Sequence, residues 1–317
     1  MADGIFQRIV DTLPMSSLRV QRLAALAVIL TQGGISVTGA IVRVTASGLG
    51  CPTWPQCFPG SFVPVPHAEV PVVHQAVEFT NRMFTFGVVL TAVLAVLAVT
   101  RAHRRREVLI YAWLMPGSTV LQAVIGGVTV RTGLLWWTVS IHLLVSMVMV
   151  WLSVLLYVKI GESDQGTDTL VVPTPLRWFA ALTATVLSAV LVTGTLVTGA
   201  GPHAGDKSAA EPVKRLQVEI TTLVHMHSSL LVAYLSLVVG LAFALLAVRA
   251  PRAVLLRLTV LVVLVCAQGL VGTVQFYTGV PAALVAIHVA GAAACTAATA
   301  ALWASMRQRS EPQPLQG

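Results

Sequence analysis

Histidines recur at a matched depth in apolar segments that are long enough to cross a membrane. His142, His288 and the pair His225/His227 each lie about two helical turns inside such a segment, and Asn81 holds the corresponding place in a fourth. Histidine within a hydrocarbon span is costly and is by default functional. Imidazoles at one depth on neighbouring helices can supply the two axial ligands of a haem iron. The pattern predicts a membrane haem protein with two sites, although neighbouring polar groups could also satisfy any single histidine.

A carboxylate and an arginine accompany Asn81 on the same face of its predicted helix. Glu78, Asn81 and Arg82 follow His74 by 4, 7 and 8 residues, which brings all four side chains to one side of a helix. A carboxylate beside a porphyrin at the membrane boundary could accept a proton or orient water. The alternative is an interfacial ion pair between Glu78 and Arg82.

Two cysteines lie close together in a predicted outer loop. Cys51 and Cys57 enclose five residues, among them Pro52 and Pro55. A disulfide could close this loop if it faces an oxidising compartment. The pair could be a structural staple or a redox pair that handles electrons.

The composition predicts a multi-pass membrane protein. Of the 317 residues, 56% are hydrophobic and only 10% are charged, whereas roughly a quarter of the residues in a soluble domain are charged. Apolar windows of membrane length predict eight helices. They run over 23–42, 77–99, 108–130, 136–158, 178–200, 218–248, 254–276 and 281–306.

The basic residues predict the orientation. With the N-terminus inside, fourteen of the 20 lysines and arginines fall on the cytoplasmic side, as the positive-inside rule favours. Both termini are then cytoplasmic and the membrane is the cell membrane. The net charge of +8 is explained by topology and attraction to anionic lipid, so no nucleic-acid partner is expected.

The helices are expected to form two pseudo-symmetric four-helix bundles in an all-α fold. The first half is 1–160 and the second is 177–317, with a cytoplasmic linker at 161–176 that is rich in glycine and proline. Arg43 and Arg131 follow the first and third helices at equivalent places. They could pair with haem propionates or be ordinary surface charges.

These residues resemble those of the haem A synthases, the cytochrome oxidase assembly enzymes that convert haem O to haem A. The resemblance covers nearly the whole chain. It is most specific from Thr45 to Cys57, at Glu78-Phe79-Thr80-Asn81-Arg82 and from Gly201 to Asp206.

The resemblance implies that His142 faces the substrate haem O in the first half. It also implies that His288 and either His225 or His227 bind a haem b iron in the second half, and the run from His227 to Leu231 favours His227. Glu78 would be the catalytic carboxylate, and the cysteines would form a redox-linked disulfide. Water would supply the oxygen for oxidation of the C8 methyl group to a formyl group.

One position departs from the family pattern. Many members have histidine where this chain has Asn81, and asparagine is a poor iron ligand. His74, two turns outward on the same face, is the expected substitute. Otherwise His142 alone holds the substrate iron.

Two other classes of function remain open at this stage. A b-type cytochrome or haem carrier would need the histidines but would leave Glu78 and the cysteines without a chemical role. A transporter would show polar helix breaks at mid-membrane, whereas the polar residues here gather at one end. For an enzyme, the expected partners are haem O, the lipid bilayer, a haem O synthase and an electron acceptor, with a homo-oligomer as a further possibility.

Overall fold

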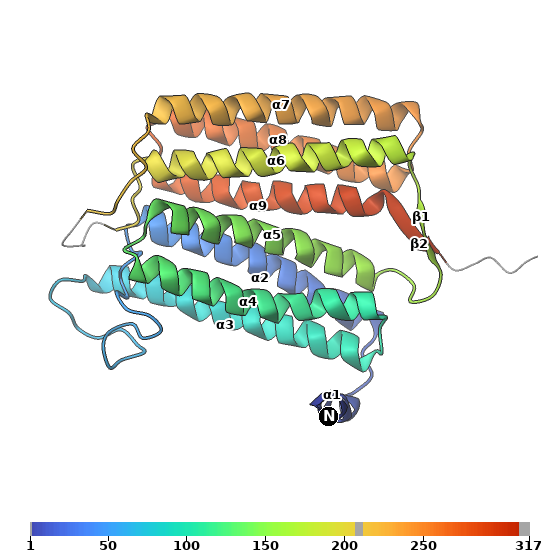
Figure 1. Cartoon of the computed structure of the whole chain (residues 1–317), viewed down its shortest axis with the longest axis horizontal. Helices are drawn as coiled ribbons and strands as arrows, with labels where there is room; N and C mark the ends of the chain where they lie inside the picture. The colour runs from blue at the N-terminus through green and yellow to red at the C-terminus, as the bar shows by residue number, and fades with distance from the viewer. Residues whose placement is uncertain (1, 207–211, 311–317) are drawn as a thin grey trace, which may run out of the picture.

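The computed structural model describes residues 2–206 and 212–310, and it is dominated by eight long apolar helices (Figure 1). Each is long enough and apolar enough to cross a membrane, so the predicted multi-pass, all-α architecture is confirmed. Their bounds are α2 (Leu18–Val44), α3 (Val72–Arg101), α4 (Arg106–Arg131), α5 (Trp136–Ile160), α6 (Thr174–Ala200), α7 (Ile220–Ala247), α8 (Arg252–Tyr277) and α9 (Ala282–Ser305).

The helices pack as two groups of four. Helices α2 to α5 form one group and α6 to α9 the other, and α9 packs against both α2 and α5 to join them. Within the second group, α6 packs closely along α7 and α8 along α9, while the two pairs touch each other less. Connections between helices alternate between the two ends of the molecule. The end that carries the long loop after α2 is called the disulfide end, and the opposite one the terminal end.

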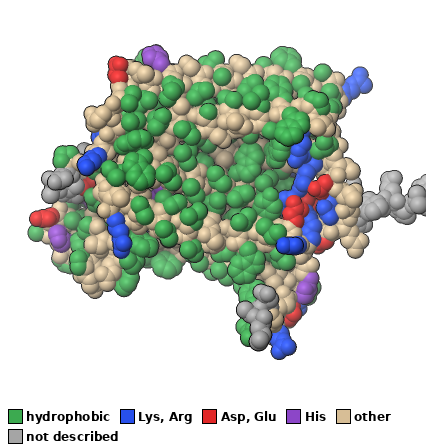
Figure 2. All heavy atoms as spheres, viewed as in Figure 1, with side chains coloured by type: hydrophobic (Ala, Val, Ile, Leu, Met, Phe, Trp, Pro, Cys, Tyr) green, Lys and Arg blue, Asp and Glu red, His purple; other side chains and the backbone are tan. Residues whose placement is uncertain are grey.

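Apolar side chains cover the outer faces of the helices (Figure 2). Phe86, Phe243 and Leu256 are each about two-thirds exposed, at 67%, 70% and 65%. Charged side chains gather at the two ends and leave the middle band apolar. This distribution is the one that a hydrocarbon environment stabilises.

Each group has its own apolar core. In the first group, Val28, Val99 and Leu156 are fully buried together. In the second, the core is centred on Val238 and Leu261. Two hydrophobic cores within one molecule agree with a repeated four-helix unit.

Two features at the terminal end were not predicted from the sequence. A short helix, α1 (Ala2–Asp11), precedes the first span and contacts α3. The segment between the halves forms strand β1 (Thr167–Leu170), which pairs in antiparallel register with β2 (Arg307–Ser310) after α9. The expected linker therefore pairs with the segment that follows the last helix.

Ion pairs fasten this linker to the first group. Arg104, between α3 and α4, donates to Asp164 at 2.8 Å, and Arg105 bonds Glu162 at 2.5 Å. Burial acts to raise the pKa of Asp164, but the hydrogen bonds and charges of the two arginines outweigh it and hold that pKa below its usual range. Arg307 on β2 pairs with Asp168 on β1 at 2.5 Å. The network joins both halves at the terminal end.

Candidate functional site

Two histidines face each other inside the second group of helices. The ring centres of His227 on α7 and His288 on α9 lie 6.4 Å apart, with the ring planes at 69°. Metal–imidazole bonds of about 2 Å on both sides of one ion, with about 1 Å from each nitrogen to its ring centre, separate the ring centres by roughly 6 Å. The spacing thus fits a haem iron held between the two imidazoles.

Hydrogen bonding orients His227 for this task. Its Nδ1 lies 3.0 Å from the Val190 carbonyl oxygen, which can only accept, so Nδ1 carries the proton and Nε2 keeps a free lone pair. Metal-bound histidines usually make such a bond with the nitrogen that does not bind the metal. The Nδ1 of His288 is buried and has no partner among the described residues. The position of His288 is fixed through its backbone, because Gln268 donates to its carbonyl at 2.5 Å.

Glycines clear space beside both rings. A Cβ atom on Gly194 of α6 would lie 3.1 Å from His227, and one on Gly272 of α8 would lie 3.1 Å from His288. Side chains there would push the imidazoles aside, so the neighbouring helices could not approach as they do. His225, the sequence-based alternative to His227, is exposed. The structure therefore brings His227, and not His225, opposite His288.

The first group of helices contains one histidine, His142, in a similar arrangement. His142 on α5 is half-buried beside Gln122 of α4, whose amide oxygen lies 2.8 Å from its Nδ1. This bond again leaves Nε2 as the free nitrogen. Gly126 is the small residue against the ring, since a Cβ there would lie 3.4 Å from Nε2. Gln122 also donates to the His142 carbonyl at 3.2 Å, as Gln268 does to that of His288.

Asn81 and His74 both have hydrogen-bond partners in their own half. The Thr38 hydroxyl on α2 donates to Asn81 Oδ1 at 2.6 Å. His74 Nδ1 lies 2.9 Å from the Ser47 hydroxyl, in the loop that leaves α2. His74 lies in the first turn of α3, and Asn81 lies two turns further into the helix.

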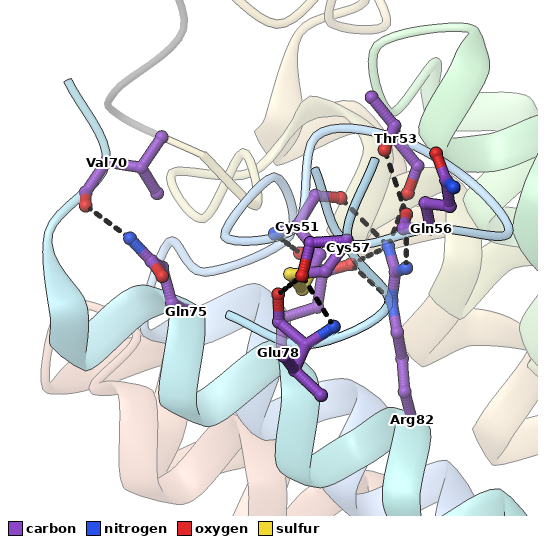
Figure 3. The surroundings of a disulfide bond; sticks show 10 residues. Cys51, Thr53, Gln56, Cys57, Val70, Gln75, Glu78 and Arg82 are labelled. Atoms are coloured by element: carbon purple, nitrogen blue, oxygen red, sulfur yellow. Dashed lines mark hydrogen bonds and ion pairs between the residues drawn. A yellow bond between two sulfur atoms is a disulfide. The ribbon is translucent and has the colours of Figure 1, made fainter. Parts of the chain in front are cut away.

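Glu78 is hydrogen-bonded to the loop that contains the cysteines (Figure 3). Cys51 and Cys57 form a disulfide, and both are fully buried. One carboxylate oxygen of Glu78 accepts the backbone N–H of Cys51 at 2.7 Å, and the other accepts Arg82 at 2.7 Å. The ion pair weighed as an alternative is therefore present, and the same carboxylate contacts the disulfide loop directly.

Arg82 completes the attachment of this loop. Besides Glu78, its guanidinium donates to the carbonyls of Cys51, Thr53 and Gln56, at 2.8, 3.0 and 3.1 Å. These partners use most of its donors. Arg82 is therefore placed to hold the loop over the end of α3.

Trp54 connects the disulfide loop to the helix beside His142. Its indole packs against Gly127 of α4, where a Cβ would lie 2.7 Å from the ring. Gly127 follows Gly126, the residue against His142. Arg131 holds the same segment, because it donates to the Trp54 carbonyl at 3.1 Å and lies 6.0 Å from the indole centre. The disulfide loop and His142 thus contact neighbouring residues of one helix segment.

Arg43 binds backbone carbonyls of the other half. It donates to Thr198 at 2.7 Å and to His203 at 2.9 Å. Arg215 donates to the same Thr198 carbonyl at 3.1 Å, and burial lowers the pKa of Arg215. Cations at a helix C-terminus are favourable, and these two satisfy the end of α6. Neither of the roles proposed for Arg43 from sequence, haem propionate partner or surface charge, anticipated these contacts.

Sequence reasoning overlooked the glutamines that orient the histidines. The same offset of 146 residues separates Gln122 from Gln268 and His142 from His288. It also separates Asn81 from His227. An internal repeat of fixed spacing was the signal that could have identified these glutamines as partners of the histidines.

Comparison with known proteins agrees with this geometry. The family model described as "Cytochrome oxidase assembly protein" matches residues 21–208. The chain is also similar to proteins named Heme A synthase. It is 32% identical over 98 residues to that of Geobacillus thermodenitrificans, which is 31% of this chain and 29% of the relative. It is 31% identical over 168 residues to that of Lysinibacillus sphaericus, which is 51% of this chain and 53% of the relative.

These alignments span 29% and 53% of the relatives' length, whereas the family model spans more than half of this chain. Its match extends from α2 through the disulfide loop, Glu78, His142 and the whole of α6. With eight membrane-length helices, paired histidines and a disulfide held by a buried carboxylate, the chain belongs to the cytochrome oxidase assembly protein family.

Proposed function

We propose that this protein is a haem A synthase that oxidises the C8 methyl group of haem O to a formyl group. The observation that carries the proposal is the combination of two histidine sites with a buried disulfide and carboxylate beside one of them. An electron-transfer cytochrome requires only the histidines, so it would give the disulfide and the carboxylate no chemical role.

In this proposal the two halves have different tasks. The second half holds haem b between His227 and His288, and haem b supplies one-electron redox chemistry when bound. The first half holds haem O with His142 as an iron ligand. The bond from its Nδ1 to the Gln122 amide oxygen fixes the direction in which its Nε2 points.

The chemistry requires two oxidations at one carbon. The first removes two electrons and one proton from the methyl group, and water adds its oxygen and releases a second proton to give an alcohol. The second removes two more electrons and protons to give the formyl group. Glu78, in contact with Cys51, is placed to pass protons between the membrane interior and the loop. The Cys51–Cys57 disulfide can accept an electron pair by becoming a dithiol.

Location and partners are also part of the proposal. The charge asymmetry supports the cell membrane, with both termini in the cytoplasm. The disulfide then lies on the outer side, where disulfides persist. Haem O reaches the site through the bilayer from a haem O synthase, and electrons leave to an external one-electron acceptor. A homo-oligomer is compatible with this scheme.

The test is conversion of haem O by the purified protein. Protein produced with haem O available should yield haem A, or its alcohol precursor, together with haem B on pigment extraction. Extraction of haem B alone would favour the electron-transfer cytochrome and contradict the proposal. A His142→Ala variant is the matched control, because it should retain haem B and lose conversion.

A further inference from the structure

The two groups of helices share a set of contacts around one histidine each. In the pair α4 and α5, Gln122, Gly126 and His142 form the set described above. In α8 and α9, Gln268, Gly272 and His288 form the same set at the same spacing. The other two helices of each group can therefore be compared position by position.

Asn81 occupies the place that His227 holds in the second half. The sequence Val37-Thr38-Gly39 of α2 recurs as Val192-Thr193-Gly194 of α6. Thr193 Oγ lies 3.2 Å from His227 Nδ1, and Thr38 Oγ lies 2.6 Å from Asn81 Oδ1. A corresponding threonine thus contacts Asn81 in the first half and His227 in the second.

Space for a larger side chain remains beside Asn81. A Cβ on Gly194 would approach His227 to 3.1 Å, but a Cβ on Gly39 would meet nothing within 4 Å. The first half therefore has a glycine, Gly39, where a histidine ring would need one. The side chain beside it, Asn81, is shorter than histidine. The asparagine therefore ends short of the position that the imidazole fills in the second half.

His74 is poorly placed to fill this position. It lies seven residues before Asn81, about 10 Å along the helix axis. Its Nδ1 is bonded to Ser47, and the backbone at His74 packs against Gly50 of the loop. These contacts hold it in the disulfide-loop region and away from the depth of His142.

The amide of Asn81 has a defined orientation. The Thr38 hydroxyl has two acceptors within reach, Asn81 Oδ1 at 2.6 Å and the Ile35 carbonyl at 3.1 Å, and the nearer is the amide oxygen. With Oδ1 turned to Thr38, the NH2 group of Asn81 is directed away from α2. An amide NH2 group is a hydrogen-bond donor only.

We propose that haem O in the first half has His142 as its single protein ligand, and that the Asn81 amide donates a hydrogen bond to a small ligand at the opposite coordination position. The inference rests on the proposed function, because it requires haem O in this half. The second half would hold its haem b with two histidines and no open position. A water molecule or small anion is the class of ligand that such a donor recognises.

The test compares spin states in purified protein loaded with both haems, by electron paramagnetic resonance and optical spectroscopy. The wild type should contain one low-spin and one high-spin ferric haem, and Asn81→His should convert the high-spin haem to low spin. His227→Asn is the mirrored control, and it should make the second haem high spin. Asn81→Leu should stay high spin but bind fluoride about tenfold or more weakly, since a hydrogen bond to an anion is lost.

Other outcomes would overturn the inference. Two low-spin haems in the wild type, one of which turns high spin in His74→Ala, would make His74 the ligand. Unchanged fluoride affinity in Asn81→Leu would remove the donor role. If the protein binds a single haem and His227→Ala loses it, the proposed function is contradicted together with this inference. Two low-spin haems would contradict this inference alone.

Discussion

Replacing Glu78 by glutamine should loosen the disulfide loop and stop haem oxidation, and these two effects can be measured separately. Glu78 is 4% exposed, and its two oxygens accept from Arg82 and from the Cys51 backbone N–H. Glutamine has the same size but a single acceptor oxygen, so its NH2 group must face one of these donors. The substitution also leaves the Arg82 charge without its counterion.

The size of the loosening follows from these contacts. A hydrogen bond to a charged group contributes about 1.5–3 kcal/mol. Arg82 keeps three carbonyl acceptors, which favours the lower part of that range. A loss of about 2 kcal/mol would make loop opening roughly 30-fold more frequent. The fold itself should survive, because the two helix cores lie apart from the loop.

Reduction of the disulfide by a water-soluble phosphine measures this opening. Both sulfur atoms are buried, so the reagent can act only on the opened loop. Glu78→Gln should be reduced roughly 30-fold faster than wild type in detergent, with an unchanged haem b spectrum. A rate equal to that of wild type would refute the argument that the carboxylate holds the loop.

A matched variant separates loop order from chemistry. Gln75, one turn before Glu78, donates to the Val70 carbonyl at 2.9 Å and carries no charge. Gln75→Leu should also speed reduction, by about fivefold, for the loss of one neutral hydrogen bond. It should still convert haem O. If Glu78→Gln converts haem O as well as Gln75→Leu does, Glu78 has only a structural role.

The remaining predictions concern the histidines, a glycine and the disulfide. His227→Ala and His288→Ala should each abolish the low-spin haem b spectrum while His225→Ala keeps it, and a loss confined to His225→Ala would reverse the assignment. Gly272→Ala should reduce haem b occupancy, because the added methyl group would crowd His288. Full occupancy with an unshifted spectrum would show that α8 and α9 can move apart at little energetic cost. Cys51→Ser should insert and bind haem b with an unfolding transition close to that of wild type, since a short closed loop contributes about 2–3 kcal/mol and only locally. Loss of haem b in this variant would show that the loop stabilises the second half.

The architecture could be predicted because its determinants are local. Eight spans follow from eight apolar windows, since a membrane requires each helix to satisfy its own backbone hydrogen bonds. The helix α1 was overlooked because ten residues are too short to span a bilayer. The pairing of β1 with β2 joins residues 139 apart, such as Asp168 and Arg307, and no local pattern encodes it.

The site was predictable in its residue types but not in its contacts. Helical spacing placed Glu78 and Arg82 together, because i and i+4 residues share a face. That Glu78 also accepts the Cys51 N–H depends on how the loop folds back over α3. The partners of Arg43 lie 155 and 160 residues away, in the other half. Such contacts arise only once the two groups of helices are packed together.

The differences between the halves are consistent with the proposed location of the reaction in the first half. Applying the 146-residue offset, Glu78 and Arg82 of the first half correspond to Val224 and Ser228 of the second. The second half keeps two facing histidines and lacks the carboxylate and the arginine, as suits a relay that only exchanges electrons. The first half keeps His142 and combines it with Asn81, Glu78 and a disulfide loop. If the proposed function holds, a repeated scaffold would bind a haem in both halves. The differences at three positions of α3 would then supply the acid–base groups and the open coordination position for oxidation with water.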